Sequence, residues 1–160
     1  MDVIKEKNIE DQKMAVINHK GNVKDMSILI ARLMSWCEVE NVEIKGYPFS
    51  IYYTSLKNTN PDDMVYDIGI EVSEDTEVTG HSHENTDKVQ VVELLSHKVL
   101  YKIHKGSYET LDDSYKKLAK YAVENNYDIV GSPKEIYFNN PYEVEEDELL
   151  TEIQFPVIKM

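Results

Sequence analysis

Runs of apolar residues predict strands in both the middle and the last part of this chain. Residues 88–95 and 98–104 are rich in Val, Leu and Tyr, and both segments are predicted to be strands. Residues 134–138 and 149–157 have the same character. Between the two pairs lies a segment whose apolar residues recur at the spacing of a helix. The second half of the chain is therefore predicted to have the order strand, strand, helix, strand, strand.

Two segments carry apolar residues at the spacing of a helix, and each follows a residue that can cap a helix. Asn22 precedes the first segment and Ser107 the second. Asn125–Asn126 tolerates the left-handed backbone on which helices end. The apolar positions are Met26, Ile30, Leu33 and Cys37 in the first segment and Leu111, Tyr115, Leu118 and Ala122 in the second.

The chain is an internal duplication with an offset of 85 residues. At this offset the tripeptide HKG at 19–21 falls on HKG at 104–106, and no gap is needed elsewhere. Glycine, proline and aromatic positions then coincide in order along both halves. The coinciding pairs include Leu33 with Leu118, Trp36 with Tyr121, Asn41 with Asn126, Gly46 with Gly131, Pro48 with Pro133 and Tyr52 with Tyr137.

The length of the repeat decides how the two copies are arranged. The period is too long and the copies are too few for a solenoid, so two units related by a pseudo-twofold axis are the simpler interpretation. We predict one domain over residues 1–160, with repeat one at about 1–75, a polar linker at 76–85 and repeat two at about 86–160.

These elements predict an α+β fold of two pseudo-symmetric strand-helix-strand-strand repeats. Their mostly antiparallel, twisted sheet would carry the helices on one face and a central ligand groove on the other. Alternation along the strand after GSP predicts that Ile136 faces the helix and that Glu135 and Tyr137 face the groove. The same rule places Tyr52 and Glu152 on the groove side. The residues of the last strand that are predicted to face the helices are Ile153, Phe155 and Val157.

The composition of the chain argues against nucleic-acid-binding, membrane-spanning and secreted proteins. The chain has 160 residues, of which 41% are apolar and 29% charged, which is typical of a globular domain. Its formal net charge of -13 and single Arg argue against nucleic-acid binding, which needs clustered basic residues. No apolar run is long enough to span a bilayer, no signal-peptide pattern is present, and a lone Cys37 cannot form an internal disulfide. We therefore expect a cytoplasmic protein without a membrane partner.

Glu135 is the first candidate for a functional residue. It lies in GSPKEIYFNNP, a turn followed by a short strand, and its counterpart in the first repeat is Ser50 within GYPFSIYY. The two stretches share glycine, proline, isoleucine and tyrosine, which identifies those residues as scaffold. The carboxylate is present in only one repeat, so we predict that it faces a ligand; a solvated strand residue is the alternative.

Aromatic residues near Glu135 in either repeat are the candidate walls of the groove. Tyr52 and Tyr137 occupy equivalent positions, and Tyr108 follows the second HKG. Each of these could instead pack against its own strand or helix. The full set of candidate ligand-binding residues is Glu135, Tyr52, Tyr137, Tyr108, Tyr47, Phe49 and Glu152, with Trp36 more typical of the core between helix and sheet.

Other reactive residue types do not form a recognisable site. The HSH motif at 81–83 has no third ligand at a fitting spacing, so we predict no metal and no cofactor. Cys37 lies on an apolar helix stripe, which favours a buried, inert thiol. His19 and His104 begin the same turn in both repeats, which favours a structural role for each.

The second-half motifs resemble the GyrI-like small-molecule-binding domain, the effector-binding domain of AraC-type and multidrug-responsive bacterial regulators. The resemblance covers nearly the whole chain. The residues that carry it are HKGSYETLDDSYKKL (104–118), ENNYDIVGSPKEIYFNNP (124–141) and LLTEIQFPV (149–157), with a weaker echo in WCEVENVEIKGYPFSIYY (36–53). The regulators also carry a helix-turn-helix region, for which this chain has neither the length nor the basic residues, so it resembles a stand-alone member.

The resemblance implies three functions. The first is binding of a small effector or drug-like molecule, cationic or lipophilic, with Glu135 as its counter-charge, in a protein linked to transcription regulation or to a multidrug or toxin response. The second is hydrolysis of reactive cyclopropane-type compounds in the same groove, with Glu135 activating water and Tyr137 polarising the substrate. The third is modulation of DNA gyrase, or another protein partner such as a regulator, through the acidic surface. The sequence leaves the ligand and the oligomeric state open.

Overall fold

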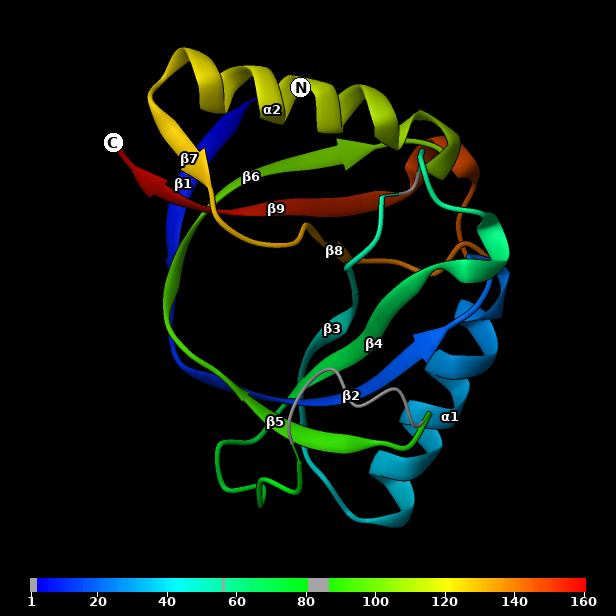
Figure 1. Cartoon of the computed structure of the whole chain (residues 1–160). Coiled ribbons are helices and arrows are strands. Elements are labelled where there is room, and N and C mark those ends of the chain that lie inside the picture. Colours follow the sequence, from blue (N-terminus) through cyan, green and yellow to red (C-terminus); the bar gives the residue numbers. More distant parts are fainter. Residues whose placement is uncertain (1–2, 56, 81–86) are drawn as a thin grey trace. The chain divides into compact units, whose positions relative to one another are not determined.

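The computed structural model describes residues 3–55, 57–80 and 87–160 of the chain. Within these residues it contains nine strands and two α-helices, and each strand pairing described below is antiparallel. The predicted α+β class is therefore confirmed. The chain divides into two compact units, Asp11–Leu95 and Met1–Glu10 with Ser96–Met160, which we call the first-repeat and the second-repeat unit (Figure 1).

The first-repeat unit is a four-stranded sheet with one helix. Its strands follow the order β3-β4-β2-β5, and α1 packs against β2 and β4. The elements are β2 (Gln12–Lys20), α1 (Met26–Val39), β3 (Ile44–Tyr52), β4 (Val65–Val72) and β5 (Gln90–Leu94).

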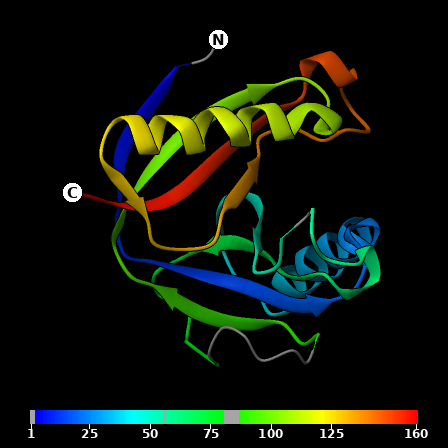
Figure 2. The same ribbon diagram turned by 45° about the horizontal axis from the view of Figure 1, so that its top comes forward.

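The second-repeat unit has the same plan with one added short strand. Its sheet follows the order β1-β6-β9-β8, and β7 pairs with β9. Helix α2 lies along β6 and β9 (Figure 2). The elements are β1 (Ile4–Ile9), β6 (His97–Lys105), α2 (Leu111–Glu124), β7 (Tyr127–Ile129), β8 (Lys134–Tyr137) and β9 (Leu150–Lys159).

The first strands of the two repeats are exchanged. Strand β1 begins the first repeat but pairs with β6, with Ile9 opposite His97. Strand β5 begins the second repeat but pairs with β2, with Leu94 opposite Gln12. The β1–β6 and β5–β2 pairings have the same register when the two repeats are aligned at the offset of 85 residues, so the exchange is reciprocal. Each unit thus contains one edge strand from the other repeat.

The cores form where the helical stripes meet alternate residues of the strands. In the first-repeat unit, the buried residues Leu29, Leu33 and Cys37 of α1 pack with Ile68 and Ile70 of β4. The predicted burial of Cys37 is confirmed, and burial raises the pKa of its thiol.

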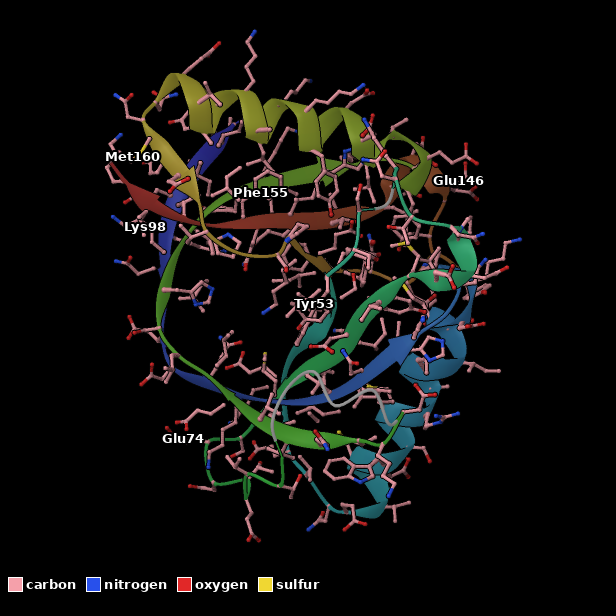
Figure 3. The ribbon with its side chains drawn as sticks, viewed as in Figure 1. Tyr53, Glu74, Lys98, Glu146, Phe155 and Met160 are labelled. Atoms are coloured by element: carbon pink, nitrogen blue, oxygen red, sulfur yellow. The ribbon has the colours of Figure 1, made fainter. Side chains whose placement is uncertain are left out.

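The second-repeat unit repeats this packing with a smaller apolar core. Leu118 and Ala122 of α2 pack with Ile153, Phe155 and Val157, as the alternation of β9 predicts (Figure 3). The same cluster includes Leu111, the first residue of α2.

Asn22 and Ser107 cap the 3₁₀ turns that precede α1 and α2 rather than the helices themselves, and α2 ends at the predicted asparagine pair. The Asn22 side chain accepts a hydrogen bond from the Lys24 N–H at 2.9 Å, and the Ser107 hydroxyl accepts one from the Glu109 N–H at 3.1 Å. Each bond caps a 3₁₀ turn that leads into the helix. After α2, Asn126 adopts a left-handed backbone with φ 60°.

The equivalent residues His19 and His104 hold the turn before each helix. His19 Nε2 lies 2.9 Å from Asp25 Oδ2, and His104 Nε2 lies 3.0 Å from Thr110 Oγ1, which is the equivalent position. His19 Nδ1 also lies 2.8 Å from Asp87 Oδ1. These bonds agree with the structural role predicted for both histidines.

We expect His19 to make the stability of the chain depend on pH. Desolvation alone would lower its pKa, but the bonds to Asp25 and Asp87 outweigh it and raise the pKa above its ordinary value. Stability from such a group is complete below the unfolded-state pKa of about 6.5 and is lost as pH rises through the folded value. His19→Gln should lower the free energy of unfolding by about 0.5–1 kcal/mol at pH 5.5, as measured by urea titration, and by less at pH 9. A deficit that grows toward pH 9 would contradict this assignment.

Gly69 should tolerate no side chain, because a Cβ atom there would lie 2.5 Å from Phe49 Cζ and 2.8 Å from Val16 Cγ1. We expect Gly69→Ala to destabilise the protein by about 1–3 kcal/mol in urea denaturation. Gly46→Ala is the matched control in the same sheet, since its Cβ would approach only Glu71, at 3.2 Å. Equal losses for the two variants would refute close packing at Gly69.

Candidate functional site

Glu135 lies on β8 and is only 3% exposed. Its partner across the strand pair is Ile153, and residues directly opposite in an antiparallel pair share a face. Because Ile153 packs with Leu118 of α2, Glu135 also faces the helix. The predicted side of the sheet is therefore wrong, and Ile136, rather than Glu135, faces away from α2.

The reason for this error is that both faces of the strand are covered. Ile136 pairs with Glu152, which is only 4% exposed although it faces away from α2. An alternating pattern reveals the inner face only when the other face is solvated. In β8, Glu135 points toward α2 and Ile136 points away from it, so a rule that assigns apolar residues to the helix side gives the wrong faces.

Two tyrosine hydroxyls hold the Glu135 carboxylate. Tyr115 of α2 donates a short hydrogen bond to Glu135 Oε2, and Tyr137 donates one to Oε1 at 2.9 Å. The Tyr108 ring meets the Tyr137 ring edge-on, with centroids 5.9 Å apart. We call these four residues the glutamate–tyrosine cluster. It places one carboxylate among three aromatic rings.

The cluster reaches the protein surface at one residue. The Tyr108 side chain is partly open to solvent, since the residue is 37% exposed, whereas Glu135 is buried. Burial, and then the negative charge of Glu135, raises the pKa of Tyr108. Tyr108 is therefore partly exposed to solvent and also close enough to Glu135 to be influenced by its charge.

The first repeat has no such cluster at the equivalent positions. Ile30 and Val23 replace Tyr115 and Tyr108 and pack against the apolar core, and Ser50 replaces Glu135. Only Tyr52 is kept in place of Tyr137. The same backbone plan thus forms without the carboxylate and without its aromatic surroundings.

Glu152 does not join Glu135, because the two side chains leave opposite faces of the sheet. Lys7 of β1 forms an ion pair with Glu152 Oε2 at 2.8 Å, and Gln154 Nε2 donates to the same oxygen at 2.6 Å. Glu152 is therefore held by its own partners within the second-repeat unit.

The predicted wall residues of the first repeat have three different environments within their unit. Tyr52 is 6% exposed and belongs to the core beneath α1, where its hydroxyl lies 4.0 Å from Met26 Sδ. Its predicted orientation away from the helix is wrong. Phe49 is buried against Gly69, and Tyr47 is 54% exposed.

A second buried carboxylate was not predicted from the sequence. Asp67 of β4 is 1% exposed and accepts hydrogen bonds from Tyr53 at 2.5 Å and from Asn18 at 2.8 Å. Burial and the charge of Asp67 raise the pKa of Tyr53. Asp67 is the equivalent of Glu152, so both repeats bury a carboxylate at this position. The signal for it is an aspartate between Tyr66 and Ile68 in the predominantly apolar strand YDIGIEV.

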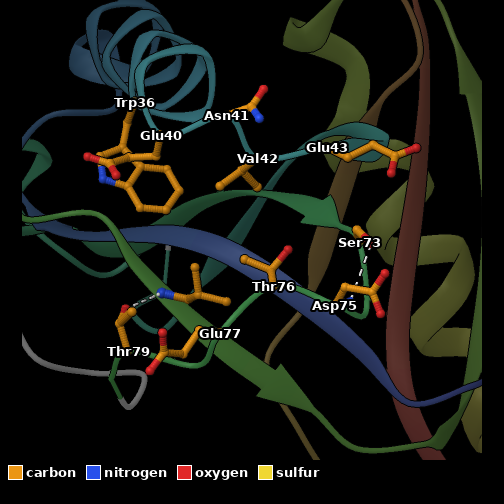
Figure 4. A pocket seen from close by; sticks show the side chains of 11 residues that line it. Trp36, Glu40, Asn41, Val42, Glu43, Ser73, Asp75, Thr76, Glu77 and Thr79 are labelled. Carbon is orange, nitrogen blue, oxygen red and sulfur yellow. Dashed lines mark hydrogen bonds between the residues drawn. The ribbon is translucent and has the colours of Figure 1, made fainter.

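An open groove of about 470 Å³ lies at the C-terminal end of α1 in the first-repeat unit (Figure 4). Trp36 forms part of its wall, together with Val42 and Val91. Carboxylates surround this apolar part. The acidic residues that line the groove are Glu40, Glu43, Asp75 and Glu77.

Among residues 3–55, 57–80 and 87–160, no group of three or more His, Cys, Asp or Glu side chains could hold a metal ion. His81 and His83 of the HSH motif lie outside the described residues. Neither α1 nor α2 has the length and apolar character needed to cross a bilayer, and the same holds for the rest of the described chain.

Comparison with known proteins gives a family match and a shared fold. The family model described as "GyrI-like small molecule binding domain" matches residues 3–158. A comparison with curated protein sequences gave no match. Among solved structures, the EcmrR C-terminal domain is 21% identical, with a TM-score of 0.80 and coverage of 99% of this chain and 98% of that chain.

Longer and more distant structures share the fold. The chain spans 58% of EcmrR in its DNA complex, at 20% identity and a TM-score of 0.82, with 99% of this chain covered. A hydrolase from Listeria innocua is 11% identical, with a TM-score of 0.67 over 97% of this chain and 91% of that one. SAV2435 bound to tetraphenylphosphonium is 15% identical, with a TM-score of 0.55 over 98% and 94%.

The hydroxyls of Tyr115 and Tyr137 should each stabilise the folded protein through Glu135. Tyr115→Phe or Tyr137→Phe should lower the free energy of unfolding by roughly 1–3 kcal/mol, since each removes a hydrogen bond to a buried carboxylate. The loss should shrink in a Glu135→Leu background, where no carboxylate remains to be satisfied. Tyr121→Phe is the matched control on the same helix, because the ring of Tyr121 stacks on Tyr127 instead. Losses that are unchanged in the Glu135→Leu background would contradict the proposed pairing.

Proposed function

The chain belongs to the GyrI-like small-molecule-binding domain family, and from that premise we propose that it binds a small lipophilic cation at the glutamate–tyrosine cluster. One observation carries the proposal. Glu135 is a buried carboxylate among three aromatic rings, and one of those rings, Tyr108, is partly open to solvent.

The electrostatics of the cluster favour a cation. Removing a carboxylate from water is unfavourable, and neutral hydroxyl donors offset only part of that loss. A ligand cation near Glu135 would be attracted to the charge of this buried carboxylate. Over a Tyr ring, the same cation would gain about 0.5–2 kcal/mol from the π face. The apolar part of such a ligand could pack against the tyrosine rings that surround Glu135.

The comparison between repeats supports a functional reason for the carboxylate. The first repeat folds to the same plan with Ser50 in place of Glu135. Buried carboxylates are an inefficient way to stabilise a fold, since apolar residues of similar volume often serve as well. The fold does not need Glu135, so recognition of a ligand is the better account of its presence.

Two of the structural neighbours point in the same direction. SAV2435 was determined with tetraphenylphosphonium, which is a lipophilic cation. EcmrR was determined on DNA, and its matching domain is one part of a longer chain. We extend the proposal to an effector-sensing role linked to transcription regulation, of the kind found in multidrug-responsive and AraC-type regulators. With a net charge of -13, residues 1–160 are not expected to contact DNA themselves.

Hydrolysis of a reactive cyclopropane-type compound is the second candidate, because the Tyr137 hydroxyl lies 2.9 Å from the Glu135 carboxylate. A carboxylate can activate water while a phenol polarises the bond that breaks. The neighbour from Listeria innocua is described as a hydrolase. Turnover of a strained cyclopropane electrophile that disappears in Glu135→Gln would support this alternative, and its absence across a broad substrate set would count against it.

The binding proposal predicts a selective loss in Glu135→Gln. Methyltriphenylphosphonium and triphenylphosphine oxide are similar in size, but only the first is charged. Isothermal titration should show that the variant binds the phosphonium at least about tenfold more weakly, which corresponds to about 1.4 kcal/mol. Affinity for the neutral oxide should change by less than about twofold, because it gains little from the carboxylate.

Glu109→Gln is the matched control for net charge. Glu109 adjoins Tyr108 in the sequence but is exposed, so the variant should bind both compounds as the parent does. Equal weakening of both compounds by Glu135→Gln, or an equal effect of Glu109→Gln, would refute the role of Glu135 as counter-charge.

A further inference from the structure

The C-terminal end of α2, in the second-repeat unit, holds a cation from its own chain. Tyr121 of α2 stacks on Tyr127 of β7, with ring centroids 6.4 Å apart. Lys159 Nζ lies over the Tyr127 ring, 4.3 Å from its centroid, and donates a hydrogen bond to the Asn125 carbonyl oxygen at 2.7 Å. An aromatic face and the negative end of a helix dipole both favour positive charge, so this position suits an ammonium.

The first-repeat unit keeps only one part of this arrangement at the equivalent positions. An aromatic ring remains on the helix, but a small apolar residue replaces the second ring and a carboxylate replaces the ammonium. The replacements are Trp36 for Tyr121, Val42 for Tyr127 and Glu74 for Lys159. The first repeat therefore lacks both the second ring and the cation that complete the end of α2.

The backbone of the two repeats also differs at this place. Strand β9 continues to Lys159, whereas β4 ends at Val72, before the equivalent position 74. The chain then turns, and the Thr76 N–H donates to the Ser73 carbonyl oxygen at 3.0 Å. The groove of about 470 Å³ lies here, with Trp36 in its wall (Figure 4). The first repeat is thus open where the second is filled by its own side chains.

The groove is lined by carboxylates that lack a cation of their own. Glu40, Asp75 and Glu77 line it, and none of the three forms an ion pair with another residue that the structure describes. Glu43 also lines it, but its carboxylate pairs with Lys45 at 3.0 Å. Exposed carboxylates alone attract a cation weakly in water, so an aromatic or apolar surface must contribute as well. The wall of the groove provides such a surface.

The backbone at the end of α1 favours the same sign of charge. Glu40 is the C-cap of α1 and the equivalent of Asn125, whose carbonyl oxygen accepts from Lys159. The Glu40 carbonyl therefore belongs to the negative end of the α1 dipole. Because position 74 is a glutamate, the first repeat does not supply the ammonium that the second repeat places here.

We infer that this groove is a second cation site, and that its ligand is an aliphatic diamine or polyamine. One primary ammonium would take the role that Lys159 has in the second repeat, over the Trp36 ring at the end of α1. The methylene chain would pack against Val42 and Val91, which also line the groove. A second ammonium would pair with the carboxylates of the groove.

N–H donors distinguish this ligand from the lipophilic cation proposed at Glu135. Lys159 binds the end of α2 through an N–H group, and hydrogen bonds from a charged donor are stronger than neutral ones. A phosphonium has no such donor. The groove lies within the first-repeat unit and does not include Glu135, so this inference is independent of the proposed function.

The fluorescence of Trp36 provides a direct test, because Trp36 is the only tryptophan in the chain and forms part of the groove wall. Titration with cadaverine, an aliphatic diamine, should change its emission saturably. Pentamethonium has the same carbon chain and charge but no N–H donor, so it should bind at least about fivefold more weakly. Magnesium chloride at equal ionic strength should leave the emission unchanged, although the chain has a net charge of -13.

Asp75→Asn and Glu74→Gln form a matched pair, because each removes one exposed carboxylate and only Asp75 lines the groove. The first variant should bind cadaverine at least about fourfold more weakly, and the second should change the Kd by less than about twofold. Val42→Tyr introduces the residue that the second repeat has at this position. It should abolish binding while the variant still unfolds cooperatively in urea.

Three results would overturn the inference: an emission that does not saturate with cadaverine, an equal change with magnesium, or equal losses in the Asp75→Asn and Glu74→Gln variants. Glu135→Gln should leave the Kd for cadaverine within about twofold, because the two sites share no residue. A parent protein that binds cadaverine but no phosphonium would therefore refute the proposed function and leave this inference standing.

Discussion

The need to satisfy a buried carboxylate organises the second-repeat unit. Glu135 offers two oxygens that have lost water, and each requires a donor. Tyr115 supplies one from α2 and Tyr137 supplies the other from β8, which ties the helix to the sheet at a defined rotation. Phe155 then packs against the Tyr115 ring, with centroids 5.7 Å apart. The carboxylate thus links α2 to β8 through hydrogen bonds that the first repeat, with Ser50 at the equivalent position, does not have.

The two repeats differ in what they bury beneath their helices. The first repeat places Ile17, Leu29 and Tyr66 under its helix, where burial of apolar surface contributes directly to folding. The second repeat buries polar residues at the equivalent positions, namely Lys102, Ser114 and Thr151. Each of these polar groups requires a partner. Duplication allows this difference, because one copy can retain an apolar core while the other accepts buried polar groups.

Local features of the fold could be predicted from the sequence, whereas the side on which the site lies could not. Caps at Asn22 and Ser107, the helical stripes and the inward residues of β9 are set by nearby residues, and they appear as expected. Glu135 was selected as a candidate from the difference between the repeats, but its face was misassigned because both sides of β8 are largely covered. Tyr115 was not recognised as its donor, because in an apolar stripe a tyrosine is indistinguishable from a packing residue until its hydroxyl has a partner.

The exchange of first strands bears on how the chain folds as it is synthesised. Strand β1 is synthesised before its partner β6, which begins at His97. The backbone N–H and C=O groups of β1 therefore lack their strand partners until β6 has been synthesised. The first repeat likewise gains its edge strand β5 only at Gln90–Leu94. Pairing between such distant segments slows folding and leaves strand edges exposed to other chains in the interval. Completion of both exchanged pairings therefore waits until the first two strands of the second repeat have been synthesised.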